Sequence, residues 1–153
     1  MKLTSRGELA LKAMLELAKA ERSDAAGLTA GEIARRCNAS PKFVEQVMAH
    51  LRSGGFVVSR LGARGGYRLA RDPGQIFVGE VSRAIDGPLA PAPCASLTQH
   101  RTCDWCDDEA TCVLKSVWTD VRDAVAGVMD AISFADLMRR AEATEAPVGR
   151  YHI

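Results

Sequence analysis

Apolar side chains recur every three to four positions over residues 3–20, and no proline interrupts them. This period predicts an amphipathic helix with one side packed on a core. The polar segment 21–27 that follows predicts a loop. The apolar positions of the helix are Leu9, Ala10, Ala13, Met14, Leu15, Leu17 and Ala18.

Two shorter helices come next, joined by a tight connection. The first, over residues 30–36, follows Thr29, and Glu32 three positions later completes the pattern of a capping box. The second begins after Ser40 and ends at the pair Gly54-Gly55. Two helices in this arrangement predict a helix-turn-helix.

A β-hairpin is predicted directly after these helices. β-prone residues over 56–60 and 67–69 flank the glycine-rich segment 62–66. A hairpin in this position is a wing, so residues 1–72 are expected to form a winged helix-turn-helix domain that binds DNA.

Residues 73–112 are expected to connect this domain to the C-terminal part. They predict a short helix over 78–85, a linker rich in proline, and an irregular loop that holds four cysteines. Residues 113–143 then predict a long helix to about residue 132, with one broad apolar face, and a final helix capped by Ser133. The tail, 144–153, is expected to be disordered. The chain is therefore mainly α-helical.

Charge is divided unevenly along the chain. Residues 1–72 carry 13 Lys and Arg against 7 Asp and Glu, a balance of +6. Residues 73–153 carry 7 against 12, a balance of −5. This division indicates that the first half faces a polyanion, the alternative being a chance scatter of surface charge.

Composition excludes several classes of protein. No apolar run approaches the roughly 18–20 residues that span a bilayer, and Arg6, Glu8 and Lys12 interrupt any signal-peptide pattern. We therefore expect a cytoplasmic protein without membrane contact, with its thiols reduced. The sequence has no nucleophile–base pattern and no phosphate-binding glycine loop before a helix, so neither an enzyme nor a small-molecule substrate is expected.

The second helix of the helix-turn-helix is expected to enter the major groove of double-stranded DNA. Ser40 and Lys42 can bond phosphates. Glu45 can accept from a cytosine amino group, and Gln46 can pair with adenine. An arginine at the wing tip suits a narrow minor groove. Each side chain taken alone could instead be solvated surface. The candidate DNA-binding residues are Ser40, Pro41, Lys42, Phe43, Glu45, Gln46, Arg52, Arg60 and Arg64.

The five cysteines fall into two groups. Cys37 stands alone near a helix end and is expected to pack as a small hydrophobic residue. Cys94, Cys103, Cys106 and Cys112 lie on one loop, with 8, 2 and 5 residues between them. Clustered thiolates in a reducing compartment select zinc or an iron–sulfur cluster. A zinc site would use all four thiolates, whereas a thiol–disulfide switch would need only Cys103 and Cys106. Spacing alone leaves these alternatives open.

The chain resembles the Rrf2 family of winged-helix regulators, with its IscR-, NsrR- and RirA-type members, over about residues 1–140. The motifs that carry the resemblance are the start Met1-Lys2-Leu3-Thr4, the segments Ser40-Pro41-Lys42-Phe43-Val44-Glu45-Gln46 and Leu51-Arg52-Ser53-Gly54-Gly55, the wing Gly62-Ala63-Arg64-Gly65-Gly66-Tyr67-Arg68-Leu69, and Cys106-x₅-Cys112 followed by Leu114 and Trp118.

The resemblance implies a homodimer whose long helices cross, an iron–sulfur cluster near the dimer interface, and a palindromic DNA operator. The long helix is thus expected to be a dimerisation helix. The implied function is a transcriptional regulator whose operator affinity is controlled by a [2Fe–2S] or [4Fe–4S] cluster that senses redox state, nitric oxide or iron. The alternatives are a zinc-stabilised or thiol-switched regulator without such a cluster, and a cofactor-free protein-interaction module.

The chain departs from the family pattern near its cysteines. The family places a cluster cysteine about five residues before the position of Cys106, where Cys103 is too near and Cys94 too far. We expect Cys94 to ligate together with Cys106 and Cys112. IscR-type members carry a histidine at the position of Lys115. NsrR-type members use an acidic residue from the partner's first helix. The resemblance therefore nominates Glu8 as the non-cysteine ligand, with His100, which lies between the cysteines, as a weaker candidate.

Overall fold

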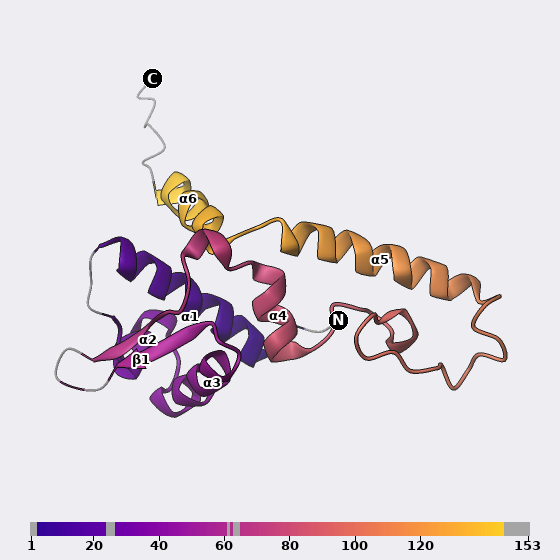
Figure 1. The fold of residues 1–153 in the computed structure, drawn as a ribbon, viewed down its shortest axis with the longest axis horizontal. Helices are drawn as coiled ribbons and strands as arrows, with labels where there is room; N and C mark the ends of the chain where they lie inside the picture. The colour runs from indigo at the N-terminus through magenta and orange to yellow at the C-terminus, as the bar shows by residue number, and fades with distance from the viewer. Residues whose placement is uncertain (1–2, 24–26, 61, 63–64, 146–153) are drawn as a thin grey trace, which may run out of the picture.

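The structure is a computed structural model that describes residues 3–23, 27–60, 62 and 65–145. The expected fold class, a mainly helical winged helix-turn-helix, is confirmed (Figure 1). The elements in chain order are α1 (Ser5–Arg22), α2 (Ala30–Cys37), α3 (Pro41–Ser53), β1 (Val57–Arg60), β2 (Gly66–Leu69), the 3₁₀ turn η1 (Pro73–Gln75), α4 (Val78–Asp86), the 3₁₀ turn η2 (Pro93–Ala95), α5 (Val113–Asp130) and α6 (Phe134–Glu145).

Side-chain caps fix where the first three helices begin. The Thr29 side chain accepts from the backbone of Glu32 and the Glu32 carboxylate accepts from the backbone of Thr29, which confirms the capping box. Ser40 Oγ accepts from the backbone N–H of Phe43 at 3.3 Å, so Ser40 caps α3 as expected. Thr4 caps α1 in the same way, through the N–H of Gly7 at 3.1 Å. Helix α1 therefore begins two residues later than the apolar period suggests.

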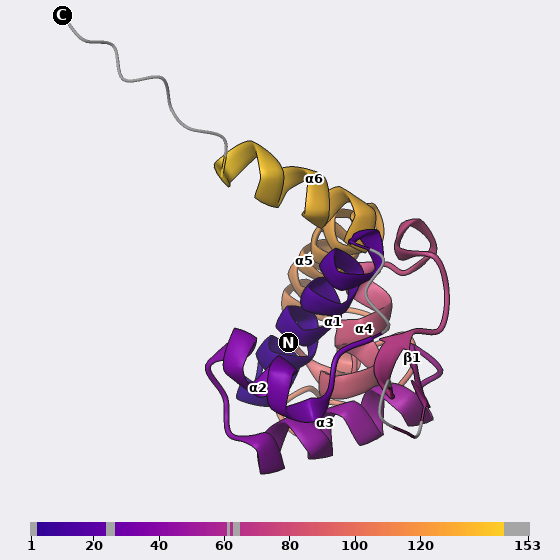
Figure 2. The same ribbon diagram turned by 90° about the vertical axis from the view of Figure 1, so that its left-hand side faces the viewer.

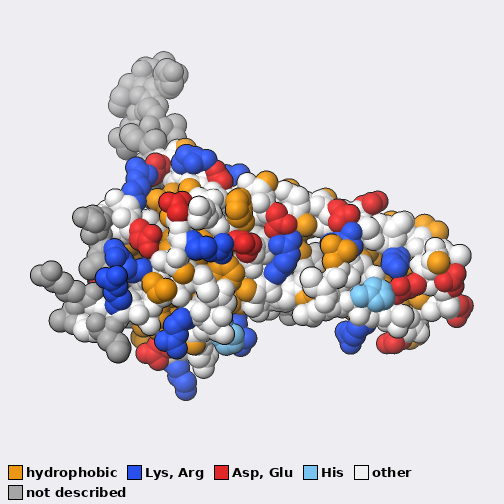
Figure 3. All heavy atoms as spheres, viewed as in Figure 1, with side chains coloured by type: hydrophobic (Ala, Val, Ile, Leu, Met, Phe, Trp, Pro, Cys, Tyr) orange, Lys and Arg blue, Asp and Glu red, His pale blue; other side chains and the backbone are white. Residues whose placement is uncertain are grey.

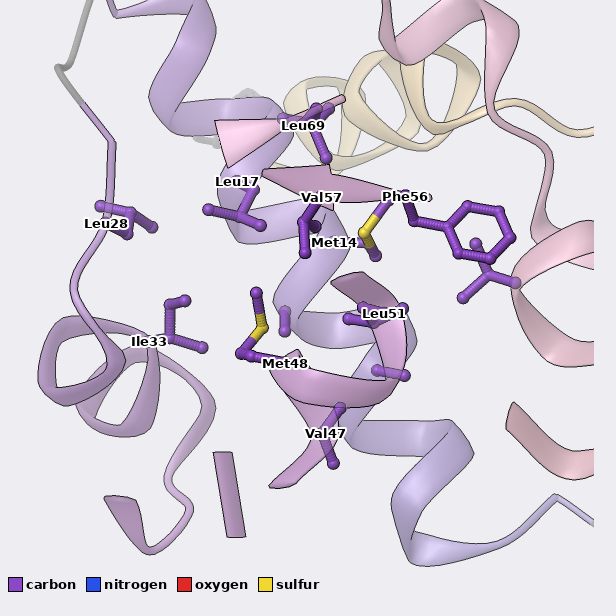
Figure 4. Packing of buried hydrophobic residues seen from close by; sticks show 14 of the residues in the cluster. Met14, Leu17, Leu28, Ile33, Val47, Met48, Leu51, Phe56, Val57 and Leu69 are labelled. Atoms are coloured by element: carbon purple, nitrogen blue, oxygen red, sulfur yellow. The ribbon is translucent and has the colours of Figure 1, made fainter. Parts of the chain in front are cut away.

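The core lies where α1, α2 and α3 meet the inner face of the wing (Figure 4). Met14 and Leu17 of α1, Ile33 of α2, and Met48 and Leu51 of α3 are almost completely buried there. Burying one such side chain contributes about 1.5–3 kcal/mol to folding. The cluster also takes in Ile76, Val81, Phe134 and Met138, so α4 and α6 close it from the other side.

The wing is a two-stranded antiparallel sheet with a third segment against it. Its register runs from Val57 opposite Leu69 to Arg60 opposite Gly66. Leu28 exchanges two backbone hydrogen bonds with Tyr67, at 3.0 and 2.8 Å. A Cβ at Gly66 would lie 2.8 Å from the Leu28 backbone and its φ is +144°, so this close approach requires glycine. At the wing tip, Leu61, Ala63 and Arg64 lie outside the described residues.

Helix α4 joins the winged part to the C-terminal half. At its end, Asp86 accepts from the Thr4 hydroxyl at 2.5 Å and from the Thr4 backbone N–H at 3.2 Å. In its middle, Arg83 makes two bonds of 2.7 Å to Asp130 of α5. One helix therefore contacts both the start of α1 and the end of α5.

Helix α5 projects away from the body, and the segment between α4 and α5 lies at its outer end (Figures 1 and 2). At 18 residues it is about 27 Å long, and none of its residues is buried. It ends two residues before the expected residue 132, because Phe134 turns into the core and Ser133 pairs with Phe77. Helix α6 continues to Glu145, so Thr144 is helical and not part of a disordered tail. Residues 146–153 lie outside the described part of the chain.

Candidate nucleic-acid interface and cysteine cavity

Helix α3 presents a polar outer face and buries the opposite one. Val44, Val47, Met48 and Leu51 are buried, while Lys42, Glu45 and Gln46 are exposed one turn from the start of the helix. The helix period therefore separates residues that hold the fold from residues that a partner can reach.

The other candidates on α3 have structural contacts as well. Pro41 occupies the first turn, where its missing N–H costs no hydrogen bond. Phe43 is half-buried against the core, and the Ser40 hydroxyl is engaged as the cap. The sequence predicted correctly that these residues lie at the start of α3. It could not show that Phe43 packs against the core, because an apolar side chain at this position could equally contact DNA.

Basic side chains continue from α3 to the wing. Arg52 near the end of α3 is exposed and donates to Ser59 of β1 at 3.4 Å. Arg60 at the end of β1 is also exposed. The third candidate arginine, Arg64, lies outside the described residues. In Figure 3, Lys and Arg side chains gather over the part of the body that α3 and the wing form, and acidic side chains gather at the far end beyond α5.

The four loop cysteines line one cavity of about 710 Å³. Cys94, in η2, is buried, and the other three thiols are half-buried. The walls also include His100, Lys115 and Trp118. The structure thus brings together the four thiols that the sequence marked as one cluster, including both alternatives for the third cysteine.

Two of these thiols influence each other's acidity. The Cys106 thiol donates to the carbonyl of Asp108 at 3.6 Å, and its interaction with the Cys112 side chain, followed by burial, raises the pKa of Cys106 to about 11. Cys112 stands at the start of α5, where the backbone of Lys115 and then the Cys106 thiol stabilise its thiolate and lower its pKa. A backbone bond from Cys106 to the Cys103 carbonyl, at 3.2 Å, folds the two-residue spacer into a turn. The pKa of Cys106 is therefore raised while that of Cys112 is lowered.

The donor set fits a metal that prefers sulfur, because four thiols and one imidazole face the same space. Within the described residues, however, no three His, Cys, Asp or Glu side chains already stand close enough to hold an ion. Binding would require the loop to draw its thiols inward.

A polar network ties the loop to α5. Glu109 accepts from Lys115 Nζ at 2.8 Å and from His100 Nε2 at 3.0 Å, both at Oε2. Lys115, followed by His100, holds the pKa of Glu109 below its usual range. Arg122 of α5 donates to the carbonyl of Ala95 at 2.7 Å, next to Cys94. None of these three contacts could be predicted from the sequence, because each joins residues whose spacing carries no pattern.

Glu8 and Cys37 lie elsewhere. Glu8 is exposed on α1 and pairs with Lys12 at 2.9 Å, and it does not line the cysteine cavity of its own chain. Cys37 is half-buried against the core at the end of α2, and burial raises the pKa of its thiol.

Helix α5 carries an exposed apolar face. Val117 and Trp118 are 45% and 36% exposed, and the face continues in both directions along the helix. Its other large exposed members are Val113, Leu114, Val121 and Val128. In the described part of the chain, no helix is long and apolar enough to cross a membrane.

Comparison with known proteins gives consistent likenesses. A family profile described as Rrf2, iron-dependent transcriptional regulator, matches residues 3–140. An rrf2-like HTH-type transcriptional regulator of Rhodobacter capsulatus is 38% identical over 137 residues, 89% of this chain and 91% of that protein. The HTH-type transcriptional regulator IscR of Salmonella paratyphi B is 32% identical over 152 residues, covering 99% and 87%.

Two solved structures share the whole fold. CymR, the global cysteine regulator of B. subtilis, superposes with a TM-score of 0.75 at 31% identity, covering 92% of this chain and 98% of that one. IscR of T. potens superposes with a TM-score of 0.74 at 32% identity, covering 97% and 94%. Three of these four relatives are named as regulators, and the name of the fourth, IscR, occurs both among the similar sequences and among the similar structures.

Proposed function

This chain belongs to the Rrf2 family of transcriptional regulators, and from that premise we propose that an iron–sulfur cluster on its cysteine loop controls its affinity for a DNA operator. The observation that carries the proposal is the convergence of Cys94, Cys103, Cys106 and Cys112 on one cavity at the outer end of α5. A cluster bound there would supply a centre that reacts with oxidants or nitric oxide and depends on iron supply.

The DNA contacts are proposed to come from α3 and the wing. The exposed residues Lys42, Glu45 and Gln46 would meet the major groove, with Ser40, Pro41 and Phe43 fixing the helix start. Arg52 and Arg60 suit the backbone, and Arg64 the minor groove. Phosphate contacts would supply most of the affinity, and base contacts the choice of sequence.

The active form is proposed to be a homodimer joined along α5. The apolar face around Val117 and Trp118 is unpartnered in the single chain, and burial against a second copy would remove it from water. Two copies related by a two-fold axis would present two α3 helices to a palindromic site.

The ligands are proposed to be Cys94, Cys106 and Cys112, with Cys103 beside them. Glu8 could join only from a second subunit, since it lies outside the cavity of its own chain. Lys115 stays protonated, because Glu109 raises its pKa, and its charge would offset that of gathered thiolates.

The thiols are proposed to act on DNA through α5 and α4. Drawing the thiols inward would shift the start of α5, and the Arg83–Asp130 bonds pass that shift to α4. The two α3 helices would then match or miss half-sites about one helical turn apart. A difference of a few kcal/mol between the two arrangements would suffice.

Anaerobic purification tests the proposal. We expect brown protein with visible absorption, stoichiometric iron, and operator affinity that changes when the cluster is removed. Cys94→Ala should lose most of the iron, while Cys37→Ala, the matched control outside the loop, should keep it. Colourless protein containing zinc would reject the cluster in favour of a structural site.

A thiol switch is the second candidate, and the interaction between Cys106 and Cys112 favours it. Metal-free protein that binds DNA only while its thiols are reduced would support this alternative. DNA binding indifferent to iron and to oxidants would leave a regulator controlled by a protein partner.

A further inference from the structure

Trp105 is 95% exposed, although it is one of the largest apolar side chains of the protein. It stands in the two-residue spacer between Cys103 and Cys106, on the loop at the outer end of α5 (Figure 1). Tryptophan is enriched at interfaces, because its ring buries a large apolar area there. The exposed ring therefore prompts a search for a surface that could cover it.

A small apolar pocket lies at the other end of α5. Its volume is about 180 Å³, and its walls include Leu3 and Leu11 of α1, Leu89 after α4, and Met129 near the end of α5. In other proteins, an apolar cavity of about 150 Å³ is large enough to bind benzene. The pocket therefore has the size and the chemistry to accept part of an aromatic side chain.

One row of apolar residues connects the two ends of α5. Spacings of three and four residues place Leu114, Trp118, Val121, Val125 and Met129 along the same side of the helix. The first two line the cysteine cavity and the last lines the apolar pocket, about 22 Å further along the helix axis. A second copy laid along this row therefore reaches both sites.

Charge favours one direction for this second copy. Residues 103–109 carry four acidic side chains and no basic one, so a parallel pairing would bring two acidic loops together. An antiparallel pairing instead brings each loop to the partner's α1, where Arg6 and Lys12 are exposed together with one acid, Glu8. A two-fold axis perpendicular to α5 gives this pairing and places the start of each helix beside the end of the other.

We propose that Trp105 of each subunit inserts into the apolar pocket at the end of α5 on the other subunit. This inference rests on the proposed function, since it needs the homodimer joined along α5, and it adds the side chain that fastens each end. The spacer that holds Trp105 also joins two of the loop thiols, so a rearrangement of these thiols moves the ring relative to the pocket. The strength of the dimer thereby depends on the state of the loop.

Trp105→Ala tests the contact through the dissociation constant of the dimer, measured by sedimentation on anaerobically purified protein. The constant should rise roughly 10- to 30-fold, as expected for loss of a buried aromatic anchor, while circular dichroism stays that of wild type. Leu97→Ala is the matched control. Leu97 is 79% exposed in the same segment, but it lies beside Asp123 and Ala126, on the side of α5 turned away from the apolar row. This control should dimerise as wild type does.

Photocross-linking in mixed dimers identifies the pocket. Unlabelled chains that carry a benzophenone side chain at position 105 are paired with ¹⁵N-labelled wild-type chains. Mass spectrometry should then find cross-links to labelled peptides that contain Leu3, Leu11 or Met129, and the same group at position 97 should give none of these.

Two results would overturn the docking of Trp105 and leave the dimer along α5 in place. One is an unchanged dissociation constant in Trp105→Ala, and the other is cross-links from position 105 that avoid these labelled peptides. Wild-type protein that stays monomeric would instead overturn the proposed homodimer, and the docking with it.

Discussion

Cys106 and Cys112 are chemically alike in sequence but differ in the folded protein. The pKa of Cys106 is raised by its interaction with Cys112, whereas the backbone at the start of α5 lowers the pKa of Cys112. The residue to which an alkylating or oxidising reagent first adds is therefore set by backbone geometry, which residue type alone does not reveal.

In metal-free protein, Cys112 should react with iodoacetamide faster than Cys106 at pH 7.5. Its larger thiolate fraction outweighs the lower intrinsic nucleophilicity of a more acidic thiol, leaving an advantage of about tenfold. Peptide mass spectrometry over a time course measures both rates. Unfolding in urea should abolish the difference, and equal rates in the folded protein would contradict the opposite pKa shifts of the two thiols.

At the level of single residues, the chemistry of the cysteines could be predicted, but not their partners. Four thiols on one loop indicate a shared site because thiolates gather around soft metals. Glu109 and Arg122 carried no such signal, since a charged side chain in a polar segment is usually solvated. Their roles come from contacts that only the fold creates.

At the scale of single elements, Ser40 at the start of α3 has two roles that can be tested separately. Its hydroxyl caps the helix, and the same residue is a candidate phosphate contact. Ser40→Ala should lower the free energy of unfolding by about 1 kcal/mol. Ser40→Asp should keep the cap, and with it the stability, yet weaken DNA binding because its charge repels phosphate.

Urea denaturation and DNA titration of both variants separate the two roles. Thr29→Ala, which removes a cap from α2, is the control for stability without a direct change at the proposed DNA surface. If Ser40→Asp bound DNA as tightly as wild type, Ser40 would be a cap only.

The contact between α4 and α5 should depend on pH. Arg83 lowers the pKa of Asp130, so this pair stabilises the fold fully above the pKa of the unfolded chain and is lost as the pH falls through the folded value. Both side chains are partly exposed, so the loss should be at most about 1 kcal/mol.

Denaturation midpoints of wild type and Asp130→Asn should therefore converge below about pH 4 and differ at pH 6. Asp120→Asn, at an exposed position on the same helix, serves as the control and should follow wild type throughout. Parallel curves for wild type and Asp130→Asn would show that the pair adds no stability.

The starts of two helices could be predicted from capping residues in the sequence. Thr29 with Glu32, and Ser40 with Pro41, fixed the starts of α2 and α3. Thr4 was missed because the apolar period begins at Leu3, which is exposed. The end of α5 was placed too late because Ile132 continues the helical period. The turn at Ser133 instead follows from the insertion of Phe134 into the core.

For the molecule as a whole, α5 separates the two candidate sites in space. The candidate DNA surface lies on the body, whereas the cysteine cavity is lined by the first turns of α5 and by the loop before it, which lies at the outer end of α5 in Figure 1. Between them stands a helix without buried residues. A second copy laid along this helix would therefore influence both ends.

Val117→Glu should convert the proposed dimer to a monomer at micromolar concentration, because a charge would have to be buried in the apolar contact. It should not unfold the single chain, since the side chain is exposed there. Sedimentation velocity gives the mass, and circular dichroism the helical content. Ser116→Glu, which adds the same charge at an exposed position about 100° around α5 from Val117, should remain a dimer. A dimeric Val117→Glu variant would place the interface elsewhere.

Phe134, Leu137 and Met138 of α6 complete, from the C-terminal side, a hydrophobic core whose other members lie within the first 85 residues. A fragment that stopped after the wing would lose this aromatic ring, and loss of a buried phenylalanine typically costs about 3–5 kcal/mol. Premature stop codons anywhere between the wing and α6 should thus yield chains that proteases clear, and not stable, isolated winged-helix domains. A chimera that borrows this DNA-reading module must also carry α6, or replace the ring that it contributes.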